Sequence, residues 1–249
     1  MEEVEVVEPI EEEVKIENVA LDKWNPKTEI GKKTKNGEIT EIDFLLDKGI
    51  RVREPEIVDA LIKDLKTDLL LIGQSKGKFG GGQRRVFRQT QKKTKEGNKP
   101  KFQTCAVIGN GDGYIGIGYG KSKETVPARE KAIRNSKLNL MKIRRGCGSW
   151  QCNCKEPHSI PFKAKGKSGS VIIELIPAPK GTGLRIEKEC QKILGMAGVK
   201  DIWSKTLGQT ETKVNVINAL INALKMLQGV KVDSDKYKEL AIVEGAIKK

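Results

Sequence analysis

Apolar residues recur along the first half of the chain with two different periods, which predict a helix, a set of strands and a second helix. In "EPEIVDALIKDL" (54–65), Ile57, Leu61 and Leu65 are four residues apart and Pro55 suits a first helical turn. The runs that follow favour extended structure, at 68–73, 83–91, 102–109 and 114–120. From Thr125 the helical spacing returns, with an apolar face formed by Ala128, Ala132, Ile133, Leu140 and Ile143.

The second half has its own alternation of strands and helices. Strands are expected at 159–164, 170–178 and 199–206, and helices at 185–198 and 211–227. The last helix carries an apolar stripe of Ile217, Leu220, Ile221, Leu224 and Leu227. The pattern predicts an α+β protein with domains at 53–145 and 159–228, a linker at 146–158, an N-terminal extension at 1–52 and a C-terminal tail at 229–249.

The N-terminal extension differs from the rest in charge and in pattern. Residues 1–22 contain nine acidic residues and one basic residue, Lys15. Turn signals stand at Asn25-Pro26 and Asn36-Gly37, and Phe44-Leu45-Leu46 is the main apolar cluster. We therefore expect residues 21–52 to become ordered only against a partner.

A glycine-rich run, "IGNGDGYIGIGYGK" (108–121), predicts a hairpin. Asn-Gly and Asp-Gly within 110–113 supply the positive φ that tight turns require. Gly116, Gly118 and Gly120 then alternate with larger residues, so one face of the second strand has no side chains. Two compatible explanations remain open for this bare face: a helix packed on it, or a phosphodiester backbone lying along it.

The same run does not fit known nucleotide-binding loops. Gly111, Gly113 and Gly116 match G-x-G-x-x-G, but a strand follows where a helix is needed, and the expected acidic residue is missing. "GIGYGKS" (116–122) is one residue short of a P-loop. A kinase loop would need His-Arg-Asp and Asp-Phe-Gly motifs, which the sequence lacks.

The charge balance points to a polyanionic partner. The formal net charge is +14, and two basic blocks, 74–101 and 121–145, flank or overlap the glycine hairpin. With three tryptophans and three tyrosines, the composition favours backbone recognition of structured RNA over base stacking. Candidate RNA-binding residues are Lys76, Lys78, Arg84, Arg85, Arg88, Lys92, Lys93, Gly111, Gly113, Gly116, Gly118, Gly120, Lys121, Lys123, Arg129, Arg144 and Arg145. Arg129 and Arg144 are expected on one side of the second helix.

The sequence also argues against a membrane or secreted protein. No run approaches the roughly 20 apolar residues of a membrane span, and the acidic start lacks the features of a signal peptide. Five cysteines, three of them within 147–154, fit a reduced cytoplasmic protein better than a disulfide framework.

Three of these cysteines and the single histidine form a candidate metal site. Cys147, Cys152, Cys154 and His158 are spaced C-x4-C-x-C-x3-H, which is enough for a closed tetrahedral zinc site. The alternative is a set of unligated thiols beside a hydrogen-bonded histidine, and the spacing leaves both open. A Cys/His nucleophile is disfavoured because no orienting acid or oxyanion motif is adjacent in the sequence.

The segments "VIGNGDGYIGIGYGKSKE", "VPAREKAIRNSKLNL" and "GKSGSVIIELIPAPKGTGL…GMAGVKDIWSKTLG" resemble ribosomal protein five of the small subunit in its archaeal form, over about residues 68–228. The resemblance implies a double-stranded-RNA-binding-like domain followed by a βαβ-type domain with a left-handed crossover, against the usual hand. The first 52 residues, the tail after 228 and the cysteine cluster depart from the bacterial pattern.

The resemblance further implies a non-enzymatic rRNA-binding constituent of the small subunit, which needs no cofactor. Such a protein lies near the mRNA entry channel, influences decoding accuracy and contacts neighbouring proteins, including protein four. By position, Ser75–Arg88 resembles the family's rRNA-inserting loop, Gly109–Lys121 its glycine hairpin, and 177–183 a segment that approaches protein neighbours. Two other functions remain as alternatives: a phosphate-handling enzyme that uses the glycine run, and a free-standing regulator that binds double-stranded RNA.

Overall fold

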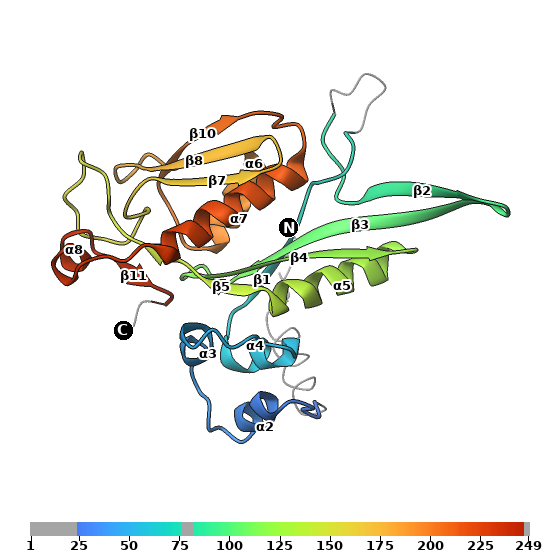
Figure 1. Cartoon of the computed structure of the whole chain (residues 1–249), viewed down its shortest axis with the longest axis horizontal. Helices are drawn as coiled ribbons and strands as arrows, with labels where there is room; N and C mark the ends of the chain where they lie inside the picture. The colour runs from blue at the N-terminus through green and yellow to red at the C-terminus, as the bar shows by residue number, and fades with distance from the viewer. Residues whose placement is uncertain (1–23, 76–81, 247–249) are drawn as a thin grey trace, which may run out of the picture. The chain divides into compact units, whose positions relative to one another are not determined.

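A computed structural model describes residues 24–75 and 82–246 (Figure 1). The predicted contacts of Lys76 and Lys78, and the acidic start, lie outside the described residues. The chain divides into two compact units, Met1–Lys63 and Asp64–Lys249.

Over its described part, residues 24–63, the N-terminal unit has three short helices: α2 (Glu29–Lys35), α3 (Asp43–Asp47) and α4 (Pro55–Leu61). Leu45 from α3 and Ile57 from α4 are fully buried. Our sequence-based expectation was that residues 21–52 need a partner for order, but residues 24–52 pack with α4 in the structure. This unit therefore includes the helix that we expected to open the next domain.

The carboxylate of Glu54, just before α4, explains much of this packing. The Trp24 indole N–H donates to Oε2 at 3.0 Å, and the backbone N–H groups of Lys27 and Thr28 donate to Oε1 at 3.0 and 2.6 Å. Partial burial acts to raise the pKa of Glu54, but the hydrogen bonds from Thr28, Lys27 and Trp24 outweigh it and hold that pKa below its ordinary value.

We expect Glu54→Gln to destabilise the N-terminal unit by about 1–2 kcal/mol at pH 7, because the charged acceptor of three donors is lost. The pKa of Glu54 is lower in the folded state than in the unfolded state. Its stabilising effect is therefore fully present above the unfolded-state pKa and is lost as the pH falls through the folded-state pKa. Amide exchange of residues 24–62 at pH 7 and pH 3 measures it. Glu38→Gln, at an exposed position, is the control, and equal exchange in both variants at pH 7 would contradict the assignment.

The first sheet of the larger unit is antiparallel and carries a helix on one face. Its strands are β1 (Lys66–Leu70), β2 (Arg88–Thr94), β3 (Gly97–Gly109), β4 (Tyr114–Ser122) and β5 (Leu140–Lys142). The order is β1-β3-β4-β5, and β2 pairs with the N-terminal half of β3. Helix α5 (Thr125–Leu138) packs on β3 and β4 (Figure 1).

The predicted glycine hairpin is confirmed. Residues 110–113 join β3 to β4, and the Asn110 side-chain oxygen accepts from the backbone N–H groups of Asp112 (2.8 Å) and Tyr114 (3.2 Å). Gly111 and Gly113 adopt φ values of 74° and 91°, in the left-handed region that favours glycine.

Helix α5 occupies the bare face of β4. A Cβ added at Gly116, Gly118 or Gly120 would come closer than 3.0 Å to backbone atoms of α5, from Ala128 to Ser136. Of the two explanations left open by the sequence, helix packing is therefore the one that the structure shows.

Two apolar residues assigned to the second helix were misplaced. Helix α5 ends at Leu138, where Asn139 caps it and also donates from its side chain to the Ile117 carbonyl at 3.3 Å. Leu140 lies in β5 opposite Gly116, and Ile143 follows β5 as a buried residue. Arg144 is in β6 (Arg144–Arg145), not on the helix. The buried residues Leu140 and Ile143 continue the helical apolar spacing beyond Leu138, where the helix ends.

The second sheet has the order β7-β8-β10-β9, with strands β7 (Ala164–Ser168), β8 (Val171–Pro177), β9 (Leu184–Arg185) and β10 (Ile202–Leu207). Strand β7 begins at Ala164, the last residue of the strand expected at 159–164. Parallel β9 and β10 are joined through α6 (Lys188–Met196), and α7 (Lys213–Gly229) packs on β7 and β8. The α+β class with a βαβ unit is confirmed, and the hand of the crossover stays a prediction.

One hydrophobic cluster runs through both predicted domains, from Leu70 and Ile115 on one side to Ile173 and Leu220 on the other. The chain after α7 adds α8 (Ser234–Glu239) and β11 (Val243–Glu244), which pairs with β6. Residues 234–244, expected as part of a tail, thus include a strand paired with a distant segment. Within the described residues no helix combines the length and hydropathy of a membrane span.

Candidate nucleic-acid interface and metal centre

An exposed two-stranded ribbon is the main cationic feature of the larger unit. Strand β2 and the N-terminal half of β3 extend beyond α5 and the other strands (Figure 1), and their residues are exposed up to Lys101 apart from half-buried Thr94. Cross-strand partners point to the same face, as do alternate residues of one strand. In the register, Lys92 lies opposite Lys99, Thr90 opposite Lys101 and Arg88 opposite Gln103. Four cations therefore share one face, which we call the ribbon face: Arg88, Lys92, Lys99 and Lys101.

The ribbon face places like charges directly opposite each other. Lys92 and Lys99 are register partners, an arrangement that destabilises an isolated antiparallel pair. Lys99 also pairs with Glu96 at 2.6 Å, but both side chains are more than half exposed, so that pair is weak in water. A polyanion laid against the ribbon face would relieve the repulsion.

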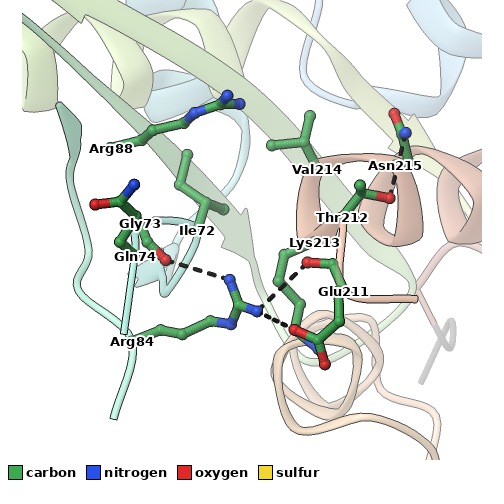
Figure 2. A pocket seen from close by; sticks show the side chains of 10 residues that line it. All are labelled: Ile72, Gly73, Gln74, Arg84, Arg88, Glu211, Thr212, Lys213, Val214 and Asn215. Carbon is green, nitrogen blue, oxygen red and sulfur yellow. Dashed lines mark hydrogen bonds and ion pairs between the residues drawn. The ribbon is translucent and has the colours of Figure 1, made fainter. Parts of the chain in front are cut away.

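The base of the ribbon opens into a pocket of about 370 Å³ (Figure 2). Arg84 ion-pairs with the Glu211 carboxylate and donates to the Gly73 carbonyl at 3.4 Å. Arg88 from the ribbon and Lys213 from the first turn of α7 line the same pocket. Lys213, which the sequence reasoning did not select, pairs with Glu187 at 3.2 Å. The cationic surface thus continues from the ribbon face to the start of α7.

The other predicted RNA-binding residues fall into different places. Lys121 is exposed and lies opposite Gln103, on the same side of the sheet as the ribbon face. Arg85 and Lys123 are exposed in connecting segments, Lys93 points to the other side of the ribbon, and Arg129 is exposed on α5. The predicted set is therefore spread over more than one surface.

Arg144 and Arg145 are buried and already hold internal partners. Arg144 Nε donates to Glu244 Oε1 at 2.8 Å, and another of its N–H groups donates to the Val230 carbonyl at 2.6 Å. Arg145 donates to Asp112 Oδ1 at 2.5 Å and to the Gly245 carbonyl at 2.9 Å. These two side chains fix the C-terminal segment, and Arg145 also fixes the glycine hairpin.

We expect Arg145→Met to cost about 2 kcal/mol of unfolding free energy, because it removes the buried partner of Asp112, whose own side chain is 38% exposed, and leaves the Gly245 carbonyl without this donor. Urea unfolding measures the loss. Arg129→Met, at an exposed position of α5, provides the control and should stay within about 0.5 kcal/mol. Similar midpoints for both variants would contradict the structural role of Arg145.

The structure brings the four predicted metal ligands together. The sulfur atoms of Cys147, Cys152 and Cys154 and a ring nitrogen of His158 all lie within 4.8 Å of one another. Cys154 Sγ is 3.6 Å from Cys147 Sγ, and Cys152 Sγ is 3.7 Å from His158 Nε2. Three thiols and an imidazole at these separations suit a single soft or borderline cation such as Zn²⁺.

The protonation of the thiols differs across the cluster. Burial, with the hydrogen-bonding contacts that Cys147 makes to Cys154 and Cys152, raises the pKa of Cys147 to about 12. Backbone N–H groups of Lys180 and Cys154 lower the pKa of Cys152 to about 6. The Cys152 thiolate is therefore available at neutral pH before a cation arrives, and the cation would have to displace the proton of Cys147.

Asp201 completes the cluster, and sequence reasoning missed it. Its carboxylate Oδ2 lies 2.8 Å from His158 Nδ1, and both side chains are buried. A carboxylate on Nδ1 fixes the tautomer that leaves Nε2 free to bind a metal. No motif spacing marks Asp201, because it is 43 residues from His158 and stands in an ordinary pre-strand position.

The exposed cationic ribbon fits a nucleic-acid-binding protein. Family models described as the ribosomal protein S5 N-terminal domain and C-terminal domain match residues 86–144 and 166–237. The small ribosomal subunit protein uS5 of Nanoarchaeum equitans is 44% identical over 92% of this chain and 98% of its own length. Its counterpart from Methanocaldococcus jannaschii is 43% identical over 91% and 98%. The chain belongs to the ribosomal protein S5 family.

Proposed function

We propose that this chain binds small-subunit rRNA through the ribbon face and the cationic residues that continue from it. The observation that supports this most is that Lys92 lies directly opposite Lys99 on an exposed ribbon, where the exposed Glu96 only weakly offsets the repulsion. Such a pairing has a cost in the isolated protein, and phosphate groups would offset it. A β-ribbon carrying few aromatic residues is suited to the phosphodiester backbone rather than to base stacking.

As a member of its family, the chain is a structural constituent of the small ribosomal subunit and not an enzyme. It associates there with rRNA and other ribosomal proteins, in the ribosome of the cytoplasm.

The proposed contacts differ in kind along the predicted set. Arg84, Arg85, Arg88, Lys92 and Lys93 supply charge on the ribbon and at its base, with Lys76 and Lys78 in the neighbouring segment. Lys121, Lys123 and Arg129 extend the cationic surface on the sheet and on α5. Gly111, Gly113, Gly116, Gly118 and Gly120 contribute by shaping the hairpin. Arg145 contributes by anchoring the hairpin, and Arg144 by anchoring the C-terminal segment.

The resemblance supports finer proposals. The chain would lie near the mRNA entry channel, contribute to decoding accuracy and contact neighbouring proteins, including protein four. The surface loop 177–183, between β8 and β9, is the proposed contact with protein neighbours.

Sedimentation of a tagged chain, followed by crosslink mapping, tests the proposal. We expect the chain in small-subunit particles, with rRNA crosslinks from Lys92 and Lys99. Recovery only in slowly sedimenting fractions with double-stranded RNA would favour the free regulator. Saturable binding of ATP by the purified wild-type chain would favour the phosphate-handling enzyme.

We also propose that Cys147, Cys152, Cys154 and His158 hold a structural Zn²⁺, because their ligand atoms converge and His158 has a carboxylate partner. Metal analysis of the purified full chain should give about one equivalent of zinc. Less than about a tenth of an equivalent, after purification without chelator, would exclude the site.

A further inference from the structure

We infer that metal at this cluster clamps the surface loop 178–183 to the linker 146–158, with Asp201 as the positioning residue. This inference rests on the proposed zinc site. It adds to that site the residue Asp201 and the effect of the metal on the rigidity of the loop.

His158 connects the thiol cluster to the rest of the unit. Its Nε2 faces Cys152 Sγ at 3.7 Å, while its Nδ1 faces Asp201 Oδ2 at 2.8 Å. A carboxylate held against Nδ1 is the arrangement that orients the Nε2 of a metal-binding histidine, and here Nε2 faces the thiols. A histidine that merely satisfied a hydrogen bond in the core would not need its second nitrogen among three thiols.

The loop 178–183 is attached to this system at two points. Near its middle, Lys180 Nζ pairs with Glu156 Oε2 of the linker at 2.7 Å. At its end, the Gly183 N–H donates to Asp201 Oδ1 at 2.8 Å. The linker residue Glu156 and the ligand His158, which acts through Asp201, therefore hold the loop in place.

Backbone hydrogen bonds fix the two ends of the linker: Gly146 bonds with Ser159, and the Cys147 N–H donates to the Leu240 carbonyl at 2.8 Å. Between Ser149 and Pro157, the segment that carries Cys152 and Cys154, there is no helix or strand and the backbone hydrogen bonds are local. The sulfur contacts at 3.6 and 3.8 Å are weak hydrogen bonds compared with metal–thiolate bonds. Metal binding would therefore decide whether the linker, and with it the loop, is rigid.

The experiment uses the full chain, its Asp201→Asn and Cys154→Ser variants, and Asp235→Asn as a matched control at an exposed position. Zinc content is measured first, then zinc affinity by competition with a chromophoric chelator, then amide exchange across 178–183 with and without chelator. In the wild type, chelation should speed exchange of the Gly183 amide, which donates to Asp201, by at least about tenfold. Cys154→Ser should show the fast exchange without chelator.

Asp201→Asn should still take up one zinc, but with an affinity about 10- to 100-fold weaker, while Asp235→Asn matches the wild type. Unchanged zinc affinity in Asp201→Asn would overturn the positioning role, even if the loop loosened. A wild type that holds zinc but shows no change in loop exchange on chelation would overturn the clamp and leave the zinc site standing. A wild type without zinc would instead refute the zinc site, and the inference with it.

Discussion

Replacing Arg88, Lys92, Lys99 and Lys101 together by glutamine is expected to weaken binding to small-subunit rRNA on the order of 100-fold at 0.15 M salt. Each cation that meets a phosphate releases a condensed counterion, so the loss should appear as a change in salt dependence as well as in affinity. The slope of log K against log salt should become shallower by about 3. Filter binding over a series of salt concentrations measures both quantities.

The control must remove the same charge elsewhere on the surface. Glutamine at four exposed lysines of the C-terminal part of the chain serves this purpose: Lys188, Lys205, Lys225 and Lys236. If this variant lost as much affinity as the first, net charge rather than the ribbon face would account for binding. The ribbon variant should also be no less stable than the wild type, because removing the Lys92–Lys99 repulsion favours the free protein.

Gly120→Ala is expected to destabilise the larger unit by about 3 kcal/mol or more, the upper range for an overpacked core. The added methyl group would overlap the Ala128 carbonyl and the Ala132 N–H, which are backbone atoms of α5 and cannot turn aside as a side chain can. Either α5 must move off the sheet or β4 must shift from its pairing with β3. Urea unfolding, followed by circular dichroism, measures the loss.

Gly195→Ala is the matched control, because nothing lies within 4 Å of the added Cβ and Gly195 is inside α6. In a helix interior, alanine is favoured over glycine by about 0.5–1 kcal/mol, so this variant should be slightly more stable than the wild type. If Gly120→Ala were also neutral, the close packing of α5 on β4 would be wrong.

The hairpin at 110–113 was predictable because its signal is local: two glycines with positive φ and an Asn side chain that closes the turn on itself. The end of α5 was not, because Leu140 and Ile143 are buried for a different reason, in and after an edge strand. The order of residues 24–52 was missed because it depends on Glu54, which is 30 residues from Trp24 in sequence.

For the candidate site, the sequence identified the four ligands and the basic residues, because clustering and charge are visible without a structure. It did not show that Lys92 faces Lys99, since register depends on the turn at Thr94–Gly97. It could not identify Asp201, or separate Arg145, which is internal, from exposed Arg129. Equal charges in a sequence carry no information on which ones face solvent.

The pairing of β6 with β11 has a consequence for synthesis of the chain. During translation, Arg144 and Arg145 emerge about 100 residues before Glu244 and Gly245, their partners in the finished protein. At about 5–20 residues per second, these two buried arginines wait some 5–20 seconds for those partners. Pairing of β6 with β11 would then be among the last folding events, after the cationic ribbon has already left the exit tunnel.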